Sequence, residues 1–178
     1  MIFSKTKLEN AFIIDIEKFE DPRGFFARGY CQREFEAHGL VFNTIQANIS
    51  RSLKKGTLRG MHYQVAPYAE AKLVRCIRGA LYDVIIDLRP ESSTYLQWLE
   101  VELTEDNYRM LYVPEGFAHG FQTLVDNTEA FYQVSQFFTP QAEGGIRYND
   151  PVFKIDWPLE ISVISQKDQN WPDFMPRR

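Results

Sequence analysis

The chain has 178 residues, the length of one ordinary domain, and leaves little room for a second. Its 20 basic and 24 acidic residues give a formal net charge of -4, without the positive excess that nucleic-acid binding requires. No run approaches the roughly 18 consecutive apolar residues of a membrane span, and no targeting segment is visible at the start. We therefore expect a cytoplasmic protein that binds neither nucleic acid nor membranes.

Short apolar or alternating runs recur about every ten residues, separated by turn signals such as Asp21–Gly24 and Pro90–Ser93. Aromatic residues make up 15% of the chain, and they suit the half-buried surface of a pleated sheet. This spacing predicts an all-β sandwich or barrel rather than βαβ units. The expected strands are Ala11–Ile16, Phe42–Ser50, Thr57–Gln64, Ala71–Ile77, Ala80–Leu88, Leu96–Leu103, Arg109–Val113, Phe121–Val125 and Glu129–Phe138.

One short helix is expected at Gln32–His38, with Gly39 as its C-terminal cap. The tail from Pro151 onward is rich in proline and tryptophan, and we expect it to form an ordered strap packed on the barrel. No repeat, linker or low-complexity segment interrupts the chain, so residues 1–178 are expected to form a single domain. The two cysteines are too few for a disulfide framework, and we expect two reduced cytosolic thiols.

The first suggestive histidine, His62, lies in the expected strand Thr57–Gln64. Strict alternation along a strand places Arg59 and His62 on opposite faces. Gly60 stands between them and permits a bulge that re-aims both side chains toward one cavity. The alternative is that His62 is an ordinary structural histidine, which is the commoner role for a lone histidine in a strand.

The second suggestive histidine, His119, ends a P-x-G-x-x-H pattern within Pro114–Gly120. This pattern resembles the second motif of the cupin superfamily, which consists of small jelly-roll barrels. In metal-binding cupins the first motif adds further histidines and a glutamate, but here it offers only His62 and Gln64. Two histidines and a glutamine are a weak set for a divalent metal, so we expect no metal site.

The chain as a whole resembles the dTDP-4-dehydrorhamnose 3,5-epimerase family of cupin-type nucleotide-sugar epimerases. Seven stretches match it in order over nearly the whole sequence, and the ordered set is far more specific than any one of them. The resemblance implies a cupin-like jelly-roll barrel with one or two short helices and a nucleoside-diphosphate 4-keto-6-deoxyhexose as substrate. The matching stretches are Asp21–Phe26, Gln46–Asn48, Leu58–Gln64, Lys72–Cys76, Val113–Phe121, Gly145–Pro151 and Ser165–Asp168.

The resemblance also implies a mechanism. A ketone at C4 acidifies the hydrogens at C3 and C5, so epimerisation needs a base, a group that stabilises the enolate, and an acid. By resemblance His62 is the base and Asp168 its orienting partner, while Lys72 faces the developing oxyanion and Tyr132 returns a proton from the opposite side. No cofactor is expected, since the substrate's own carbonyl accepts the electrons.

Further residues are candidate contacts for the substrate. Arginine and lysine suit the diphosphate, because guanidinium groups match phosphate oxygens bidentately. Arg23 and Lys167 have a simpler reading as solvated surface cations, and Glu143 has one as part of a plain turn. The candidate substrate contacts are Arg23, Gln46, Asn48, Arg59, His119, Glu143 and Lys167.

Several alternatives stay open at this stage. The residues fit inversion at C3, at C5 or at both, and Arg28 and Ala47 depart from the family pattern in a way that leaves the preferred nucleotide base open. A catalytically silent sugar-binding cupin and a metal-dependent cupin enzyme are the competing functions. We also expect a homodimer in which the N-terminal strands pair across subunits. The resemblance implies it, and the edge of the Ala11–Ile16 strand would otherwise be open.

Overall fold

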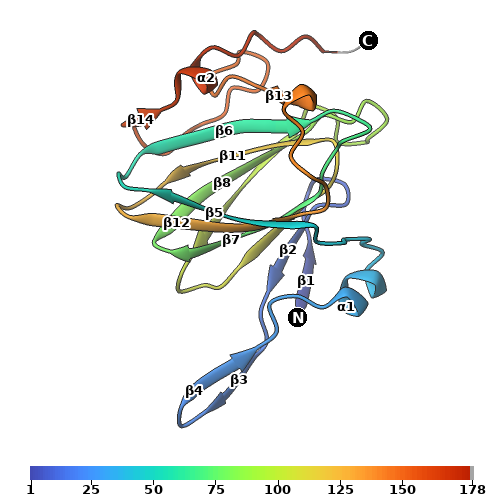
Figure 1. Cartoon of the computed structure of the whole chain (residues 1–178), viewed down its shortest axis with the longest axis vertical. Coiled ribbons are helices and arrows are strands. Elements are labelled where there is room, and N and C mark those ends of the chain that lie inside the picture. The colour runs from blue at the N-terminus through green and yellow to red at the C-terminus, as the bar shows by residue number, and fades with distance from the viewer. Residues whose placement is uncertain (177–178) are drawn as a thin grey trace.

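Two sheets face each other and form a flattened barrel in the computed structural model, which describes residues 1–176 (Figure 1). The all-β fold expected from the sequence is confirmed. The first sheet has the order β1 (Ile2–Lys5), β2 (Phe12–Asp15), β10 (Met110–Val113), β7 (Lys72–Arg78), β12 (Thr128–Val134) and β5 (Gln46–Ser52). The second has the order β13 (Glu143–Gly145), β6 (Thr57–Gln64), β11 (Phe117–Thr123), β8 (Ala80–Asp87) and β9 (Trp98–Thr104), with β14 (Val163–Ile164) alongside β6.

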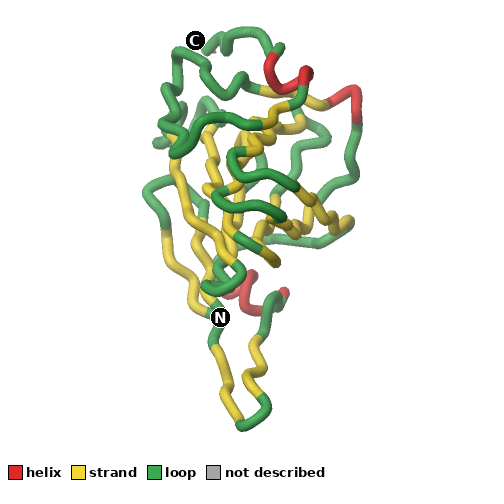
Figure 2. The backbone as a smooth tube through the Cα atoms, turned by 90° about the vertical axis from the view of Figure 1, so that its left-hand side faces the viewer, coloured by secondary structure: helices red, strands yellow, loops and turns green. Residues whose placement is uncertain are grey.

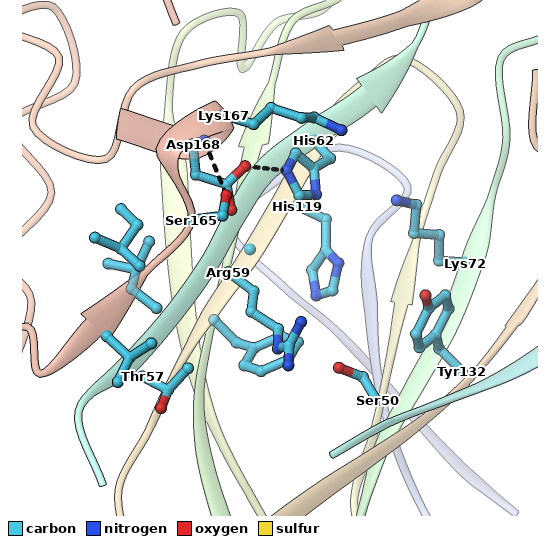
Figure 3. Close-up of a pocket in the computed structure, with 15 residues that line it drawn as sticks. Ser50, Thr57, Arg59, His62, Lys72, His119, Tyr132, Ser165, Lys167 and Asp168 are labelled. Atoms are coloured by element: carbon cyan, nitrogen blue, oxygen red, sulfur yellow. Dashed lines mark hydrogen bonds and ion pairs between the residues drawn. The ribbon is translucent and has the colours of Figure 1, made fainter. Parts of the chain in front are cut away.

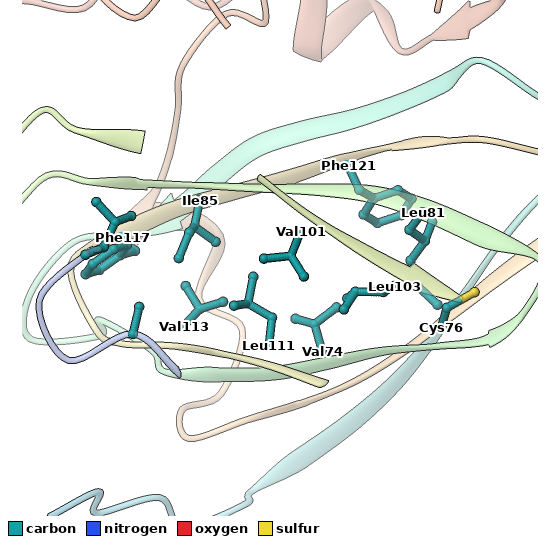
Figure 4. Packing of buried hydrophobic residues seen from close by; sticks show 13 residues of the cluster. Val74, Cys76, Leu81, Ile85, Val101, Leu103, Leu111, Val113, Phe117 and Phe121 are labelled. Carbon is teal, nitrogen blue, oxygen red and sulfur yellow. The ribbon is translucent and has the colours of Figure 1, made fainter. Parts of the chain in front are cut away.

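The core between the sheets is built from the inward-facing residues of these strands (Figure 4). Leu81 and Ile85 of β8 alternate with outward-facing neighbours, as expected for a strand buried on both faces. They meet Val74 of β7 and Leu111 of β10 from the opposite sheet, and all four side chains are completely buried. Phe121 belongs to this core and Tyr132 packs against it, so the hydrophobic core ends at these two rings.

Chain segments outside the barrel cover the outer face of each sheet. Phe35 of helix α1 (Gln32–Ala37) packs with Phe42 and Tyr112 on the outside of the first sheet. The C-terminal tail lies over the outside of the second sheet, where Phe153 joins an apolar cluster with Ile86 of β8. The ordered strap predicted from the tail is therefore confirmed. A second short helix, α2 (Gln166–Gln169), and a single 3-10 turn, η1 (Pro140–Ala142), complete the elements.

A two-stranded hairpin, β3 (Lys18–Asp21) and β4 (Gly24–Ala27), projects from the barrel (Figure 2). Its residues Phe19 and Phe26 stand opposite each other in the strand register and are 60% and 68% exposed. The sequence indicated a turn here but not the flanking strands, which lack the long alternating pattern of the barrel strands. An isolated hairpin is marginally stable in water, and large exposed phenylalanines on a hairpin are typical of a surface that another protein chain covers.

Most of the expected strands are present, but several bounds differ. Strand β5 begins at Gln46 rather than Phe42, and β12 ends at Val134 rather than Phe138. Strand β11 begins at Phe117, four residues before the expected start at Phe121, because its Ala118 and Gly120 pair with β8 despite their weak strand propensity. Strand β1 was not expected, and it pairs antiparallel with β2 inside the same chain. The edge of β2 is therefore covered, and β1 is the outermost strand of the sheet in its place. The pairing of N-terminal strands across subunits stays a prediction.

The expected helix is present. Helix α1 ends one residue earlier than expected, and Gly39 follows it in the left-handed conformation with a φ of 76°. Cys31 and Cys76 are both free, and burial raises the pKa of the Cys76 thiol to about 11. Among the described residues no helix is long and apolar enough to cross a membrane.

Candidate active site

A polar cavity opens between the two sheets where the apolar core ends (Figure 3). It divides into two lobes of about 410 Å³ each, which share His62, Lys72 and Tyr132. The first lobe is closed on one side by the tail segment around α2, and the second lies toward β13. Ten of the eleven site residues predicted from the sequence line one lobe or both: Gln46, Asn48, Arg59, His62, Lys72, His119, Tyr132, Glu143, Lys167 and Asp168.

The expected irregularity in β6 is present and lies at Gly60. His62 stands opposite His119 of β11, yet Arg59 stands opposite Phe121, so the register shifts within this short interval. Gly60 has a φ of 113°, a conformation that side-chain-bearing residues avoid. As a result Arg59 and His62 line the same lobe, which strict alternation along the strand would prevent.

His62 and Asp168 form a close pair, with His62 Nε2 2.6 Å from Asp168 Oδ1. The second oxygen of Asp168 accepts from the backbone amide of Gly60 at 3.3 Å. Burial opposes ionisation of this carboxyl, but the hydrogen bonds from His62 and Gly60 hold its pKa below the usual range. An ionised Asp168 only accepts, so His62 donates from Nε2 and keeps a lone pair on Nδ1.

Tyr132 and Lys72 reach the cavity from the opposite sheet. They lie across from His62 in Figure 3, on β12 and β7 of the first sheet, whereas His62 belongs to the second. Burial, and next the negative charge of Glu70, raise the pKa of the Tyr132 phenol, while Arg59 acts in the other direction. The phenol therefore stays protonated near neutral pH and is able to donate.

The remaining polar residues of the first lobe are held by partners. Arg59 donates from Nε to Ser52 Oγ at 3.1 Å, which ties the guanidinium to strand β5. His119 Nε2 lies 2.9 Å from Oδ1 of Asp83, a completely buried carboxylate of β8. Lys167 of α2 donates to Glu143 of β13 at 2.5 Å and so joins the rims of the two lobes.

Gln46, Asn48 and Glu143 lie in the second lobe. Gln46 and Asn48 are two apart on β5, so both face inward as strand alternation requires. Gln46 accepts from the backbone amide of Phe138 at 2.9 Å, which fixes one wall of this lobe. The second lobe therefore offers amide and carboxylate groups, whereas the first offers Arg59 and Lys167 as cations.

Arg23 is the predicted site residue that the fold leaves outside the cavity of its own chain. It lies in the turn of the β3–β4 hairpin, where its side chain is 90% exposed and pairs with Asp21 at 2.5 Å. The local geometry matches the simpler reading of a solvated loop cation. Because the hairpin projects away from the barrel, Arg23 does not reach the cavity of its own chain, and its role as a substrate contact stays a prediction (Figure 1).

The donor set around His62 fits a divalent metal poorly. Gln64 is buried and its amide is occupied by backbone groups, with the carbonyl oxygens of Tyr68 and Phe137 accepting from its nitrogen and the amide of Thr139 donating to its oxygen. His62 and His119 each direct one ring nitrogen to an aspartate. Within residues 1–176 no three His, Cys, Asp or Glu side chains come together as a metal site.

The residues missed from the sequence include two that line the cavity and Asp83, the buried partner of His119. Ser50 shares the inward face of β5 with Gln46 and Asn48, and this two-residue spacing was a usable signal. Glu70 likewise stands two residues before Lys72, although it precedes the strand itself. Asp83 gave no such signal, because an aspartate within a β-branched run shows its partner only after the strands have paired.

A jelly-roll barrel with a polar cavity between its two sheets places the protein in the cupin class. The family model for dTDP-4-dehydrorhamnose 3,5-epimerase matches residues 5–175. The chain belongs to that family, and the enzyme is an isomerase.

Individual relatives agree with the family match. The dTDP-4-dehydrorhamnose 3,5-epimerase of Shigella flexneri is 42% identical over 172 residues, which cover 96% of this chain and 94% of that protein. The crystal structure of the enzyme of that name from Elizabethkingia anophelis is 40% identical, with a TM-score of 0.95, over 98% of this chain and 96% of the other. That from Bacillus anthracis, with TDP and PPi bound, is 39% identical with a TM-score of 0.93, over 97% and 99%.

Proposed function

We propose that this protein converts dTDP-4-dehydro-6-deoxy-D-glucose to dTDP-4-dehydro-L-rhamnose by inverting C3 and C5. The observation that carries the mechanism is the placement of His62 and Tyr132 on opposing sheets of one cavity. A proton removed from one side of a sugar ring and returned from the other side inverts the carbon. The family match and the relatives named above support the choice of substrate.

The base in this proposal is His62. Its Nδ1 takes the proton from C3 or C5, and the electron pair of the broken C–H bond moves into the C4 carbonyl to form an enolate. Asp168 orients the ring and stabilises the imidazolium that results. Because the ketone of the substrate accepts the electron pair, this step is balanced without any cofactor.

Lys72 and Tyr132 complete the reaction on the other side. The Lys72 ammonium stabilises the negative charge on the C4 oxygen, an effect that is strong in a cavity shielded from water. Tyr132 then donates its phenolic proton to the carbon from the face opposite His62. The enzyme is left with a protonated histidine and a phenolate, and proton transfer through water restores both for the second carbon or the next substrate.

The other cavity residues bind the nucleotide sugar in this proposal. Arg59 and Lys167 contact the diphosphate, since both are cations on the rim of the first lobe. His119, fixed by Asp83, contacts the sugar. Gln46, Asn48 and Glu143 offer hydrogen bonds to hydroxyl groups and to the base.

The protein is also proposed to be a homodimer, for a reason different from an open strand edge. The β3–β4 hairpin exposes Phe19 and Phe26 while projecting from the barrel, and a second copy would cover them. Arg23 at the hairpin turn can then contact a substrate only in the cavity of that second copy. We further propose that residues 1–178 form one cupin-like domain, and that the free thiols reflect a cytoplasmic protein.

The proposed function is tested by incubating the protein with dTDP-4-keto-6-deoxyglucose in deuterated water and following the sugar by NMR. We expect deuterium at both C3 and C5 and the appearance of the L-rhamno product. Deuterium at one carbon alone would restrict the activity to that carbon. A protein that binds the nucleotide sugar but incorporates no deuterium would be a silent binding protein, and the proposal would be wrong.

A further inference from the structure

Glu70 is an acidic residue of the second lobe, and among residues 1–176 its carboxylate forms an ion pair with Lys72. Its Oε1 lies 3.0 Å from Nζ of Lys72, and the two side chains are only 12% and 10% exposed. Removing a carboxylate and an ammonium from water is costly, and a buried ion pair adds little stability compared with apolar residues. The pair also lines the cavity with Tyr132 and His62, so its location indicates a role in the reaction rather than in the stability of the fold.

We propose that Glu70 is a positioning residue of the epimerase reaction, which holds the Lys72 ammonium at the enolate oxygen and places a negative charge in the lobe that the Tyr132 phenol lines. The inference rests on the proposed function, because positioning Lys72 matters only if the cavity carries out the proposed proton transfers.

The first part of this role follows from the chemistry of lysine. An ammonium at the end of four methylene groups is a mobile point charge with three rotatable donors. Two negatively charged phosphates bind in the same cavity in the proposed complex and attract every nearby cation. A carboxylate 3.0 Å from Nζ holds Lys72 against that attraction, and leaves the diphosphate to Arg59 and Lys167.

The second part concerns the charges around the phenol of Tyr132. The titratable groups that line the two lobes together with it are Glu70 and Lys72 on the β7 side, Arg59 and His62 on β6, His119 on β11, Glu143 on β13, and Lys167 and Asp168 on α2. Burial makes the largest contribution to the raised pKa of Tyr132, and the charge of Glu70 adds to it, while Arg59 opposes it. Without Glu70 the pKa of the phenol would fall while burial continues to raise it, so Tyr132 would lose its proton at a lower pH on the alkaline side of the profile.

The decisive variant is Glu70→Gln, which keeps the size of the side chain and removes its charge. Its matched control is Glu129→Gln, which removes the same charge from β12 outside the cavity, where Glu129 lies 3.6 Å from Arg51. Both are compared with the wild type for kcat, KM and the pH profile of kcat, using the NMR assay with dTDP-4-keto-6-deoxyglucose.

Loss of an enolate-stabilising donor itself costs on the order of 10²–10³ in kcat, so we expect roughly a 10-fold loss when only its positioning carboxylate is removed. KM should change little in Glu70→Gln, and the alkaline limb of its pH profile should move to lower pH. Glu129→Gln should match the wild type in all three measurements. Wild-type kcat and pH profile in Glu70→Gln would overturn the inference.

A second variant, Glu70→Asp, separates positioning from a purely structural role. It retains the charge on a shorter side chain, so we expect the alkaline limb to stay near its wild-type position and kcat to recover in part. Equal losses of kcat in both variants, with no movement of the alkaline limb in either, would show a structural role and overturn the inference. A wild-type protein without deuterium incorporation would contradict the proposed function itself, which is a distinguishable result.

Discussion

Gly60 of β6 and Gly120 of β11 lie so close that a Cβ on Gly60 would stand 2.6 Å from the Gly120 Cα. A Cβ on Gly120 would in turn stand 2.7 Å from the backbone oxygen of Arg59. Any side chain at either position would push the two strands apart. This backbone contact lies between Arg59 and His62, at the irregularity that turns both toward the cavity, so two glycines maintain the geometry of the proposed base.

The base and the acid should fail in different ways. His62→Ala should reduce deuterium uptake at C3 and at C5 together by about 10²–10⁴ in rate, because the enolate forms slowly without the base. Tyr132→Phe keeps the ring packed on the core, so it should still exchange but epimerise poorly. NMR of the sugar in deuterated water separates the two results. Tyr112→Phe, on the outer face of the first sheet, is the control and should match the wild type. Exchange near the wild-type rate in His62→Ala would contradict this assignment.

Asp168→Asn should reduce turnover far more than stability. The amide keeps the shape of the side chain and can still accept from Gly60, but it no longer stabilises the imidazolium of His62. Replacing the orienting aspartate of a catalytic histidine typically costs about 10⁴ in kcat, whereas the midpoint of thermal unfolding should move little. Asp173→Asn removes a tail carboxylate that pairs with Arg147, and it should leave turnover unchanged. Near-normal turnover in Asp168→Asn would make this residue a structural part of the tail.

Treatment with EDTA followed by dialysis should leave turnover intact. The reason is the chemistry of the donors, since Gln64 is occupied by backbone groups and both cavity histidines are paired with aspartates. Turnover is measured before and after treatment, and again after addition of individual divalent metals. Loss of activity that one particular metal restores would contradict the proposed mechanism.

Acid should destabilise the fold through Asp87. This buried carboxylate accepts from Arg89, Ser92 and Thr94, and although burial opposes ionisation, these bonds hold its pKa below the ordinary value of 3.8. Ionised Asp87 therefore stabilises the fold above about pH 4, and this contribution is lost as the pH falls through its lower folded pKa.

The variant Asp87→Asn tests this origin of acid sensitivity. It should be less stable at neutral pH by roughly 1–3 kcal/mol, because Arg89 loses its partner. Its urea midpoint should then depend less on pH between about 2 and about 5 than that of the wild type. An unchanged acid dependence would place the titrating groups elsewhere.

The hairpin phenylalanines should control the oligomeric state. Replacing both Phe19 and Phe26 by serine removes the largest apolar surface of the hairpin, so light scattering should show a monomer where the wild type gives a dimer. Met175→Ser is the control, since Met175 is also highly exposed but lies in the tail. A strictly monomeric wild type would refute the dimer at once.

Local patterns were sufficient for much of this protein. Alternation along strands such as β6 and β8, and turn signals between them, predicted an all-β barrel before any pairing was known. The glycine between Arg59 and His62 also predicted the irregularity in β6. These properties depend on residues within a few positions of one another, and the side-chain period of a strand is a local property.

Tertiary structure decided which of these residues meet. His62 and Asp168 are 106 positions apart, and only the docking of the tail beside β6 brings them within a hydrogen bond. Glu143 and Lys167 are likewise brought together only by the docked tail. Arg23 lies in one of the stretches that match the family, but its hairpin places it outside the cavity of its own chain. The edge of β2 is paired with β1, a strand of only four residues whose sequence shows no clear alternation of apolar and polar residues. Such contacts depend on which apolar surfaces bury one another across the whole chain, and no local window of sequence contains that information.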